Sequence, residues 1–294
     1  MKQKAFRRVL TVILALVFVC SAAVILQHFH DRRQAVESHE NALQIAIPDA
    51  APVEEPETEA SDDPFRTSVL PQERPAVTMP DEELPLAIAP EKPAAPIMPE
   101  AVRSLRTLDL EALRQINSDV LGWIHLPDTV ISYPLVDSHD NAEYLNLTWD
   151  KQKSRSGSIF LERKSSTDLS DFHTLIYGHN WQDGIMFSPL LQYADQEFAD
   201  SHSNLYLITD EAILQYTVFS AYTADVVSNT YRLYFEDDAR RQECIEFWKE
   251  KSVITSDVTP EITDRVLSLS TCTGRGIDGI RWVVHTVLTE VYPR

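Results

Sequence analysis

Cys272 has the setting of a nucleophile. It ends the β-like run RVLSLSTC, and the glycine-containing loop TGRG follows at once. A thiol at a strand end is accessible and can lie near backbone amide donors. A small buried residue is the alternative, because free cysteine is often part of a core. The other two cysteines of the 294-residue chain contrast with it, since Cys244 shares an apolar helical face with Phe247 and Cys20 lies in an apolar run.

His179 is the candidate acid or base. It follows the β-like run TLIY and Gly178, which permits a sharp bend that brings the imidazole out at the mouth of the strand. A surface-loop histidine is the alternative, since the chain has nine histidines. His285, on the last β-like run, is predicted to be half-buried and is a second candidate base. Three other histidines are predicted to be ordinary loop or strand-end residues: His125, His173 and His202.

Arg281 is the candidate for stabilising negative charge. It begins the last β-like run, IRWVVHTVL, where a period of two places it on one face with Val283 and His285. An Arg at the head of an apolar strand is often only a solvated strand end. It follows Cys272 by nine residues across a loop, so it lies beside the thiol if the two strands pair. A thiol, an imidazole and a guanidinium together would support acyl transfer through a thioester.

Residues 101–294, a normal size for one domain, contain the elements that must position these side chains. Eight short β-like runs with few helices predict a mostly β fold, a closed or nearly closed barrel with helical insertions. A parallel α/β sheet would need a helix after almost every strand. The predicted strands are Gly122–Leu126, Val130–Val136, Ser158–Leu161, Thr174–Tyr177, Leu205–Thr209, Leu214–Tyr222, Arg265–Thr271 and Arg281–Tyr292.

Four helical patches are predicted between and before these strands. Thr107 can cap the first, with Leu110, Leu113 and Ile116 on its buried face. The others are Asp140–Leu147, a segment that starts at Ser188 with Pro189 in its first turn, and Glu236–Lys251, with Cys244, Phe247, Trp248 and Lys251 at helical spacing.

The N-terminal residues 1–33 are predicted to be a cytoplasmic tip and a transmembrane anchor. The uncharged run Val9–Leu26 has 18 residues and spans about 27 Å as a helix, close to the thickness of the hydrocarbon core. Four cations precede the run, which favours a cytoplasmic N-terminus and an extracytoplasmic domain. A cleaved signal peptide is the alternative, but Ser21-Ala22-Ala23 is a poor cleavage context before three further apolar residues.

Residues 34–102 are predicted to be a disordered stalk rich in Pro and acidic residues, followed by a catalytic domain at 103–294. Twelve of the 17 prolines lie between Pro48 and Pro99. Frequent Pro blocks helices and sheets, and the negative charges repel one another. The whole chain has 26 Lys and Arg against 45 Asp and Glu, a net charge of −19, which argues against a general nucleic-acid binder.

The ordered set TLIYGHN, LSTC and R-W-V-V resembles the sortases, membrane-anchored cysteine transpeptidases of Gram-positive bacteria. The stretch YGHNWQDGIMFSPLLQYADQEFADSHSNLYLIT and the helix predicted before the cysteine strand are similar to class B. The resemblance covers roughly residues 105–292. It implies an eight-stranded sortase-type β-barrel with N-terminal helices and a helical insertion before the cysteine strand.

The resemblance also implies residue roles. Cys272 would be the nucleophile, His179 the proton donor and Arg281 the contact for substrate or oxyanion. Four further residues would line the peptide groove: Asn141, Leu145, Ser270 and Tyr231. One departure is Thr273, where many class B members have an acidic residue, and this leaves the sorting signal open.

The implied activity is that of a cell-membrane, single-pass transpeptidase without metal or cofactor. It would cleave a C-terminal sorting signal of surface proteins, of the NPxTx or PxTG type, after Thr. The Thr carboxyl would then be joined to an amine of a peptidoglycan cross-bridge or to a pilin Lys. Two alternatives stay open: an extracytoplasmic cysteine peptidase that hydrolyses peptides, and a stalked non-enzymatic binding module with an incidental cysteine.

Overall fold

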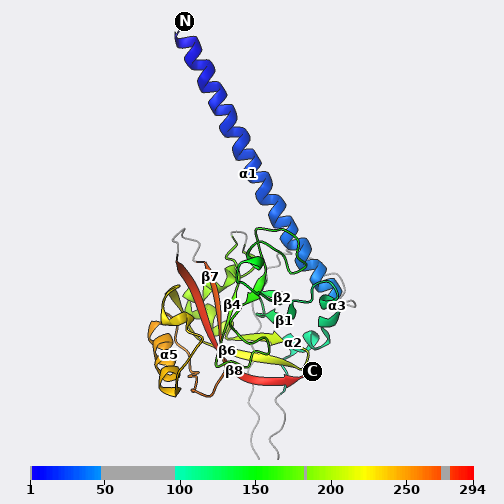
Figure 1. The fold of residues 1–294 in the computed structure, drawn as a ribbon, viewed down its shortest axis with the longest axis vertical. Coiled ribbons are helices and arrows are strands. Elements are labelled where there is room, and N and C mark those ends of the chain that lie inside the picture. Colours follow the sequence, from blue (N-terminus) through cyan, green and yellow to red (C-terminus); the bar gives the residue numbers. More distant parts are fainter. Residues whose placement is uncertain (1, 48–96, 182–183, 273–278) are drawn as a thin grey trace, which may run out of the picture. The chain divides into compact units, whose positions relative to one another are not determined.

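A closed eight-stranded β-barrel forms the body of the protein. The computed structural model describes residues 2–47, 97–181, 184–272 and 279–294 (Figure 1). All eight predicted β-like runs form strands, in the barrel order β1-β2-β3-β4-β7-β8-β6-β5. The strands are β1 (Val120–His125), β2 (Ser132–Asp137), β3 (Ile159–Leu161), β4 (His173–Tyr177), β5 (Asn204–Ile208), β6 (Ala212–Asp225), β7 (Val266–Cys272) and β8 (Ile280–Pro293).

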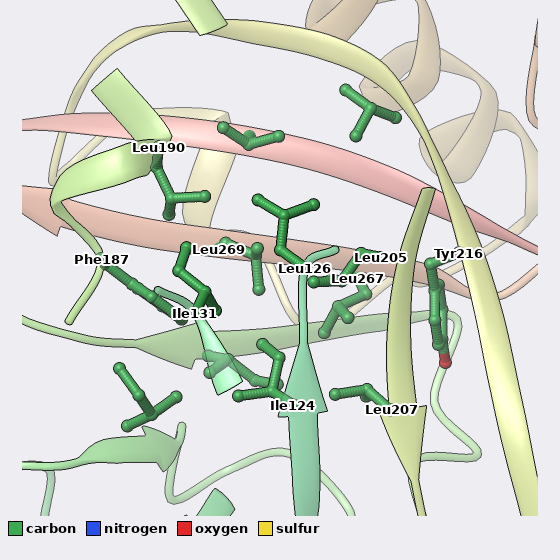
Figure 2. Close-up of a cluster of buried hydrophobic side chains, with 14 of the residues drawn as sticks. Ile124, Leu126, Ile131, Phe187, Leu190, Leu205, Leu207, Tyr216, Leu267 and Leu269 are labelled. Atoms are coloured by element: carbon green, nitrogen blue, oxygen red, sulfur yellow. The ribbon is translucent and has the colours of Figure 1, made fainter. Parts of the chain in front are cut away.

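The barrel interior is filled by side chains that alternate along the strands. On β1, Ile124 joins the interior cluster while Trp123 joins a cluster on the outer face, as a period of two requires. On β5, Leu207 points inward in the same way. Both faces of these strands are buried, which explains their nearly continuous apolar sequences. Figure 2 shows the interior cluster, including Ile124, Leu126, Ile131, Phe187, Leu190, Leu205, Leu207, Tyr216, Leu267 and Leu269.

Helices pack on the outside of the barrel. The N-terminal ones pack on Trp123 and Ile208, and α5 packs on β6, β7 and β8 through Trp248, which is fully buried. The helices are α1 (Lys2–Ala46), α2 (Glu100–Arg103), α3 (Leu110–Arg114), α4 (Gln196–Ser201) and α5 (Asp238–Lys251), with 3₁₀ turns η1 (Ser104–Thr107), η2 (Glu143–Leu145), η3 (Ser188–Ala194) and η4 (Asn229–Tyr231).

The predicted cap of the first domain helix is wrong. The Asp109 carboxylate, not Thr107, accepts the hydrogen bond from Ala112 N–H at 2.9 Å, while the Thr107 hydroxyl donates to a carbonyl of its own 3₁₀ turn. Leu110 and Leu113 are buried as predicted. Ile116 is 51% exposed, because α3 ends at Arg114 and the periodicity no longer applies.

The other helical patches are smaller than predicted. Only Glu143–Leu145 is helical within Asp140–Leu147, and it forms a single 3₁₀ turn. Ser188 begins η3 rather than capping it, since its hydroxyl donates to the carbonyls of Trp181 and Ile185. The predicted helix before the cysteine strand is confirmed as α5, whose cap is Asp237.

Helix α1 differs from the predicted boundary between anchor and stalk. It continues without a break to Ala46, and its Ala42 and Ala46 are fully buried against the domain. A disordered stalk beginning at residue 34 is therefore wrong for residues 34–46, and buried Val102 shows that domain packing begins before residue 103. Residues 48–96 of the predicted stalk lie outside the described residues. By length and composition Ile13–Ala46 could cross a membrane, although a signal sequence near an N-terminus passes the same test.

Candidate active site

Three strand ends bring the predicted site residues to one edge of the barrel. Strands β4 and β7 are parallel neighbours, with Tyr177 opposite Ser270, so both end at this edge. Strand β8 runs antiparallel to β7, and Arg281 is the register partner of Cys272. Directly paired residues on antiparallel strands have Cα atoms only about 4.5–5.5 Å apart. The pairing of β7 with β8, on which the predicted position of Arg281 depends, is therefore present. His179 follows the end of β4 by two residues.

The ring of His179 is held by the backbone of η2. Its Nε2 lies 2.8 Å from the Leu145 carbonyl oxygen. A carbonyl only accepts hydrogen bonds, so Nε2 carries a proton in this arrangement. Gly157 makes the close approach of this loop to the ring feasible, because it has φ +61° and a Cβ there would lie 2.9 Å from His179 Cδ2. The same Cβ would lie 2.6 Å from the Tyr144 carbonyl oxygen, so only glycine fits.

A cavity of about 380 Å³ opens beside these strand ends. His179 and Arg281 both line it, and the Arg281 side chain is half-buried with Nη1 donating to the Ile280 carbonyl at 3.0 Å. The structure also brings together on its walls all four residues implied as groove residues: Asn141, Leu145, Ser270 and Tyr231. Thr273 and the rest of the loop 273–278 lie outside the described residues.

Polar contacts fix the walls of this cavity. On one side the hydroxyls of Tyr231 and Ser270 lie 3.0 Å apart. On the other, Asn141 Nδ2 donates to Glu162 Oε2 at 2.5 Å, and its Oδ1 accepts from the backbone N–H of Arg163 at 2.8 Å. Glu162 is only 6% exposed, an uncommon position for a carboxylate, and sequence reasoning missed it. A lone Glu after a short strand has no local signal that distinguishes it from a surface residue.

His285 is not an alternative base at this site. It is fully buried, with Nδ1 2.5 Å from the Ser268 hydroxyl and Nε2 3.1 Å from the Tyr222 hydroxyl. Burial, together with the neighbouring His173, holds the pKa of His285 well below its usual value. The prediction that it is half-buried is wrong because α5 places Trp248 over the outer face of β8, where the rings of Trp248 and His285 stack 4.9 Å apart.

His173 joins the same buried network and is not an ordinary strand-end residue. Its Nε2 lies 2.7 Å from the Ser268 hydroxyl, and its Nδ1 lies 2.7 Å from the Arg232 carbonyl oxygen. The Tyr222 hydroxyl at the other end of the network lies 2.8 Å from that of Thr230. The buried network therefore contacts Thr230 and Arg232, the two sequence neighbours of Tyr231, and Tyr231 itself lines the cavity.

We expect this network to make the fold acid-sensitive. Burial lowers the pKa of His173 to about 4, whereas the unfolded chain titrates near 6.5. Between those values the unfolded state binds a proton that the folded state does not, so the free energy of unfolding falls as the pH falls, by roughly 3 kcal/mol for this residue. Urea unfolding at several pH values measures the slope. His173→Gln should give a shallower slope, and an equally steep one would show that His173 does not carry the effect.

No family model matches the chain. Two curated relatives match it: sortase B of Staphylococcus aureus, 37% identical over 162 residues, and sortase B of Listeria monocytogenes, 32% identical over 164 residues. These matches cover 55% and 56% of this chain, and 66% and 67% of the relatives, so the chain spans about two thirds of their length.

Two solved structures share the fold. A Staphylococcus aureus sortase B–substrate complex is 35% identical with a TM-score of 0.59, covering 62% of this chain and 84% of that chain. A sortase B complexed with triglycine is 34% identical with a TM-score of 0.58, covering 65% and 88%.

Proposed function

Because the chain belongs to the class B sortases, a family of cysteine transpeptidases, we propose that it cleaves a C-terminal sorting signal of surface proteins after Thr and transfers the Thr carboxyl to an amine. The observation that carries the proposal is the register of the barrel. It pairs Cys272 with Arg281 at the edge where β4 leads into His179. The histidine comes from a segment far from the other two in the sequence, and an incidental cysteine would not need this arrangement.

The proposed first step forms a thioester. The Cys272 thiolate attacks the Thr carbonyl carbon, and Arg281 with backbone N–H groups stabilises the oxyanion. The C–N bond breaks, and His179 gives a proton to the departing amine. In the second step an acceptor amine attacks the thioester and loses a proton to His179, and the thiolate leaves.

The cavity beside these residues is proposed to hold the sorting peptide. Its hydroxyl and amide groups, on Ser270, Tyr231 and Asn141, can bond an extended peptide, and Leu145 offers an apolar contact. The staphylococcal relative has been solved as a substrate complex, which supports substrate binding by this chain. NPxTx and PxTG sequences both fit this chemistry.

The acceptor is proposed to be an amine of a peptidoglycan cross-bridge or a pilin Lys. A sortase B has been solved with triglycine, a short peptide with a free amine, which supports an amine acceptor. The enzyme is proposed to be retained in the cell membrane by the run Val9–Leu26, with its N-terminus inside and the barrel outside. Protease added to intact protoplasts should then degrade the domain and spare the N-terminus.

We expect the acyl-enzyme to prefer an amine to water. A thioester is reactive toward amines, and tethering to the membrane concentrates acceptors near the site. In the test, a Thr-containing sorting peptide is incubated with the protein, with and without triglycine or a Lys-bearing pilin domain. The masses of the products are then measured by mass spectrometry. Product joined at the Thr carboxyl supports transpeptidation. Hydrolysed peptide alone would favour the peptidase, and a thiol unreactive toward both peptide and alkylating agents would favour the binding module.

A further inference from the structure

Helix α1 docks on the barrel domain with one face. Past the apolar run, its contacts with the domain recur every three or four residues, the spacing that keeps them on one side of a helix. The contacting residues are His28, Asp31, Ala35, Ser38, Ala42 and Ala46. The helix that carries the proposed anchor is thus continuous with the helix that packs on the domain.

The first of these contacts lies next to the active site. The His28 ring stacks on Trp181, with centroids 6.1 Å apart and planes 12° apart. Trp181 follows His179 by two residues, and a cavity of about 470 Å³ is lined by both His28 and His179. His179 therefore lies at the level along α1 at which the apolar run has just ended.

The rise per residue of α1 gives the distance of each contacting residue from the end of the apolar run, measured along the helix axis. At about 1.5 Å per residue, His28 lies about 3 Å beyond Leu26, Asp31 about 7 Å and Ser38 about 18 Å. Asp31 pairs with Arg155 at 3.8 Å, and the Ser38 carbonyl accepts from Trp149 Nε1 at 2.8 Å. The polar layer on each side of the hydrocarbon core is about 5–8 Å thick. A tilt of α1 only reduces the height of these residues above the hydrocarbon core. His28 and the part of the domain beside it therefore lie inside the polar layer.

We propose that the rim formed by Asn146, Arg155, Asn180 and Trp181 around His179 contacts the phospholipid headgroups of the membrane that holds α1. The inference rests on the anchor proposed above. The residue types suit the place, since Trp is enriched at the membrane interface and cations are drawn to anionic headgroups. The Arg155 side chain is 65% exposed. Figure 1 shows α1 leaving the domain on the side toward which β7 ends and β8 begins.

The contact affects how a substrate reaches the site. A sorting peptide tethered to the same bilayer is presented at the depth of His179, whereas a free peptide has to enter between the domain and the membrane. The enzyme should therefore act faster on a membrane-tethered peptide than on the same peptide in solution, beyond the gain in local concentration alone.

The first test measures depth and needs no turnover. The full chain, labelled with 5-fluorotryptophan, is placed in nanodiscs of phosphatidylglycerol and phosphatidylcholine that carry a gadolinium-chelate headgroup lipid. The ¹⁹F resonance of Trp181, identified by its loss in Trp181→Phe, should be broadened far more than that of Trp248, which is fully buried on α5. In parallel, flotation of the protein with lipid vesicles reports whether it is anchored. If the protein floats with the vesicles but the Trp181 and Trp248 resonances have equal line widths, the contact is overturned and the anchor is not. Failure to co-float would overturn the anchor and the contact together.

The second test moves the barrel away from the bilayer. Seven polar helix-forming residues inserted between Leu26 and Gln27 add about 10 Å and return the docked face to nearly the same side. The Trp181 resonance should narrow, and turnover of the tethered peptide should fall relative to that of the soluble peptide. The same seven residues between Met1 and Lys2 are the control and should change neither. If the insertion after Leu26 leaves the ratio between turnover of the tethered peptide and turnover of the soluble peptide unchanged, the proposal is overturned.

Discussion

Replacing Cys272 by Ala should abolish both thioester formation and transfer. The substitution removes the proposed nucleophile from the last position of β7, and loss of a covalent nucleophile typically costs about 10⁴-fold or more in rate. The backbone pairing of residue 272 with Arg281 does not depend on the thiol, so the fold should persist. Mass spectrometry of the protein after incubation with a sorting peptide would show the acyl adduct in the wild type and none in the variant.

Cys244→Ala is the matched control, because it removes a thiol from the same chain at a place without proposed chemistry. Cys244 is 3% exposed on α5, and burial raises the pKa of its thiol, which makes it a poor nucleophile. We expect full activity and a loss of about 1 kcal/mol in the free energy of unfolding, since a small gap opens beneath α5. An adduct that survives in Cys272→Ala and disappears in Cys244→Ala would reverse the assignment.

His179→Ala should lower the rate of transfer by about 10²–10⁴-fold, the usual contribution of a positioned acid or base. The ring is held on the Leu145 carbonyl at the cavity beside Arg281, and its loss leaves the departing amine without a proton donor. Single-turnover measurements of acylation, with product followed by mass spectrometry, give the rate directly. The peptide should still bind, because the hydroxyls of Ser270 and Tyr231 remain in place.

His139→Ala is the control for this change. The His139 side chain is 67% exposed, and its ring nitrogens lie 3.8 Å and 3.6 Å from the Asp119 and Asp137 carboxylates, so its removal should leave the rate unchanged. A rate in His179→Ala within a few-fold of that of His139→Ala would show that His179 is a groove residue and that the proton comes from another group.

Local sequence was sufficient for the strands and for the order of the reactive residues. The runs that became β7 and β8 are apolar, the second is rich in Val and Thr, and a glycine-containing loop separates them, which together favour strands. The difference in setting between Cys272 and Cys244 was also visible in the sequence. Cys272 ends a strand, whereas Cys244 lies four residues before Trp248, at helical spacing. These features depend on neighbours within a few residues, which a single chain displays directly.

The capping of short helices was decided by local competition that composition does not resolve. Thr107 and Asp109 are both good caps, and the structure uses Asp109 because η1 already engages the Thr107 hydroxyl. Gly157 and Glu162 carried no sequence signal for a different reason. Their importance lies in contacts with Tyr144, His179 and Asn141, which are brought to them by other strands and turns.

From its sequence alone this protein has an apolar N-terminal run, a barrel of eight strands and a Cys, a His and an Arg at strand ends. Only the tertiary structure decided that His285 is sealed beneath Trp248, and that α1 continues to Ala46 along the barrel. The physical reason is the same in both cases. Burial of a side chain depends on which distant surface covers it, and a marginal helix such as residues 34–46 is stabilised by the face on which it packs rather than by its own propensity.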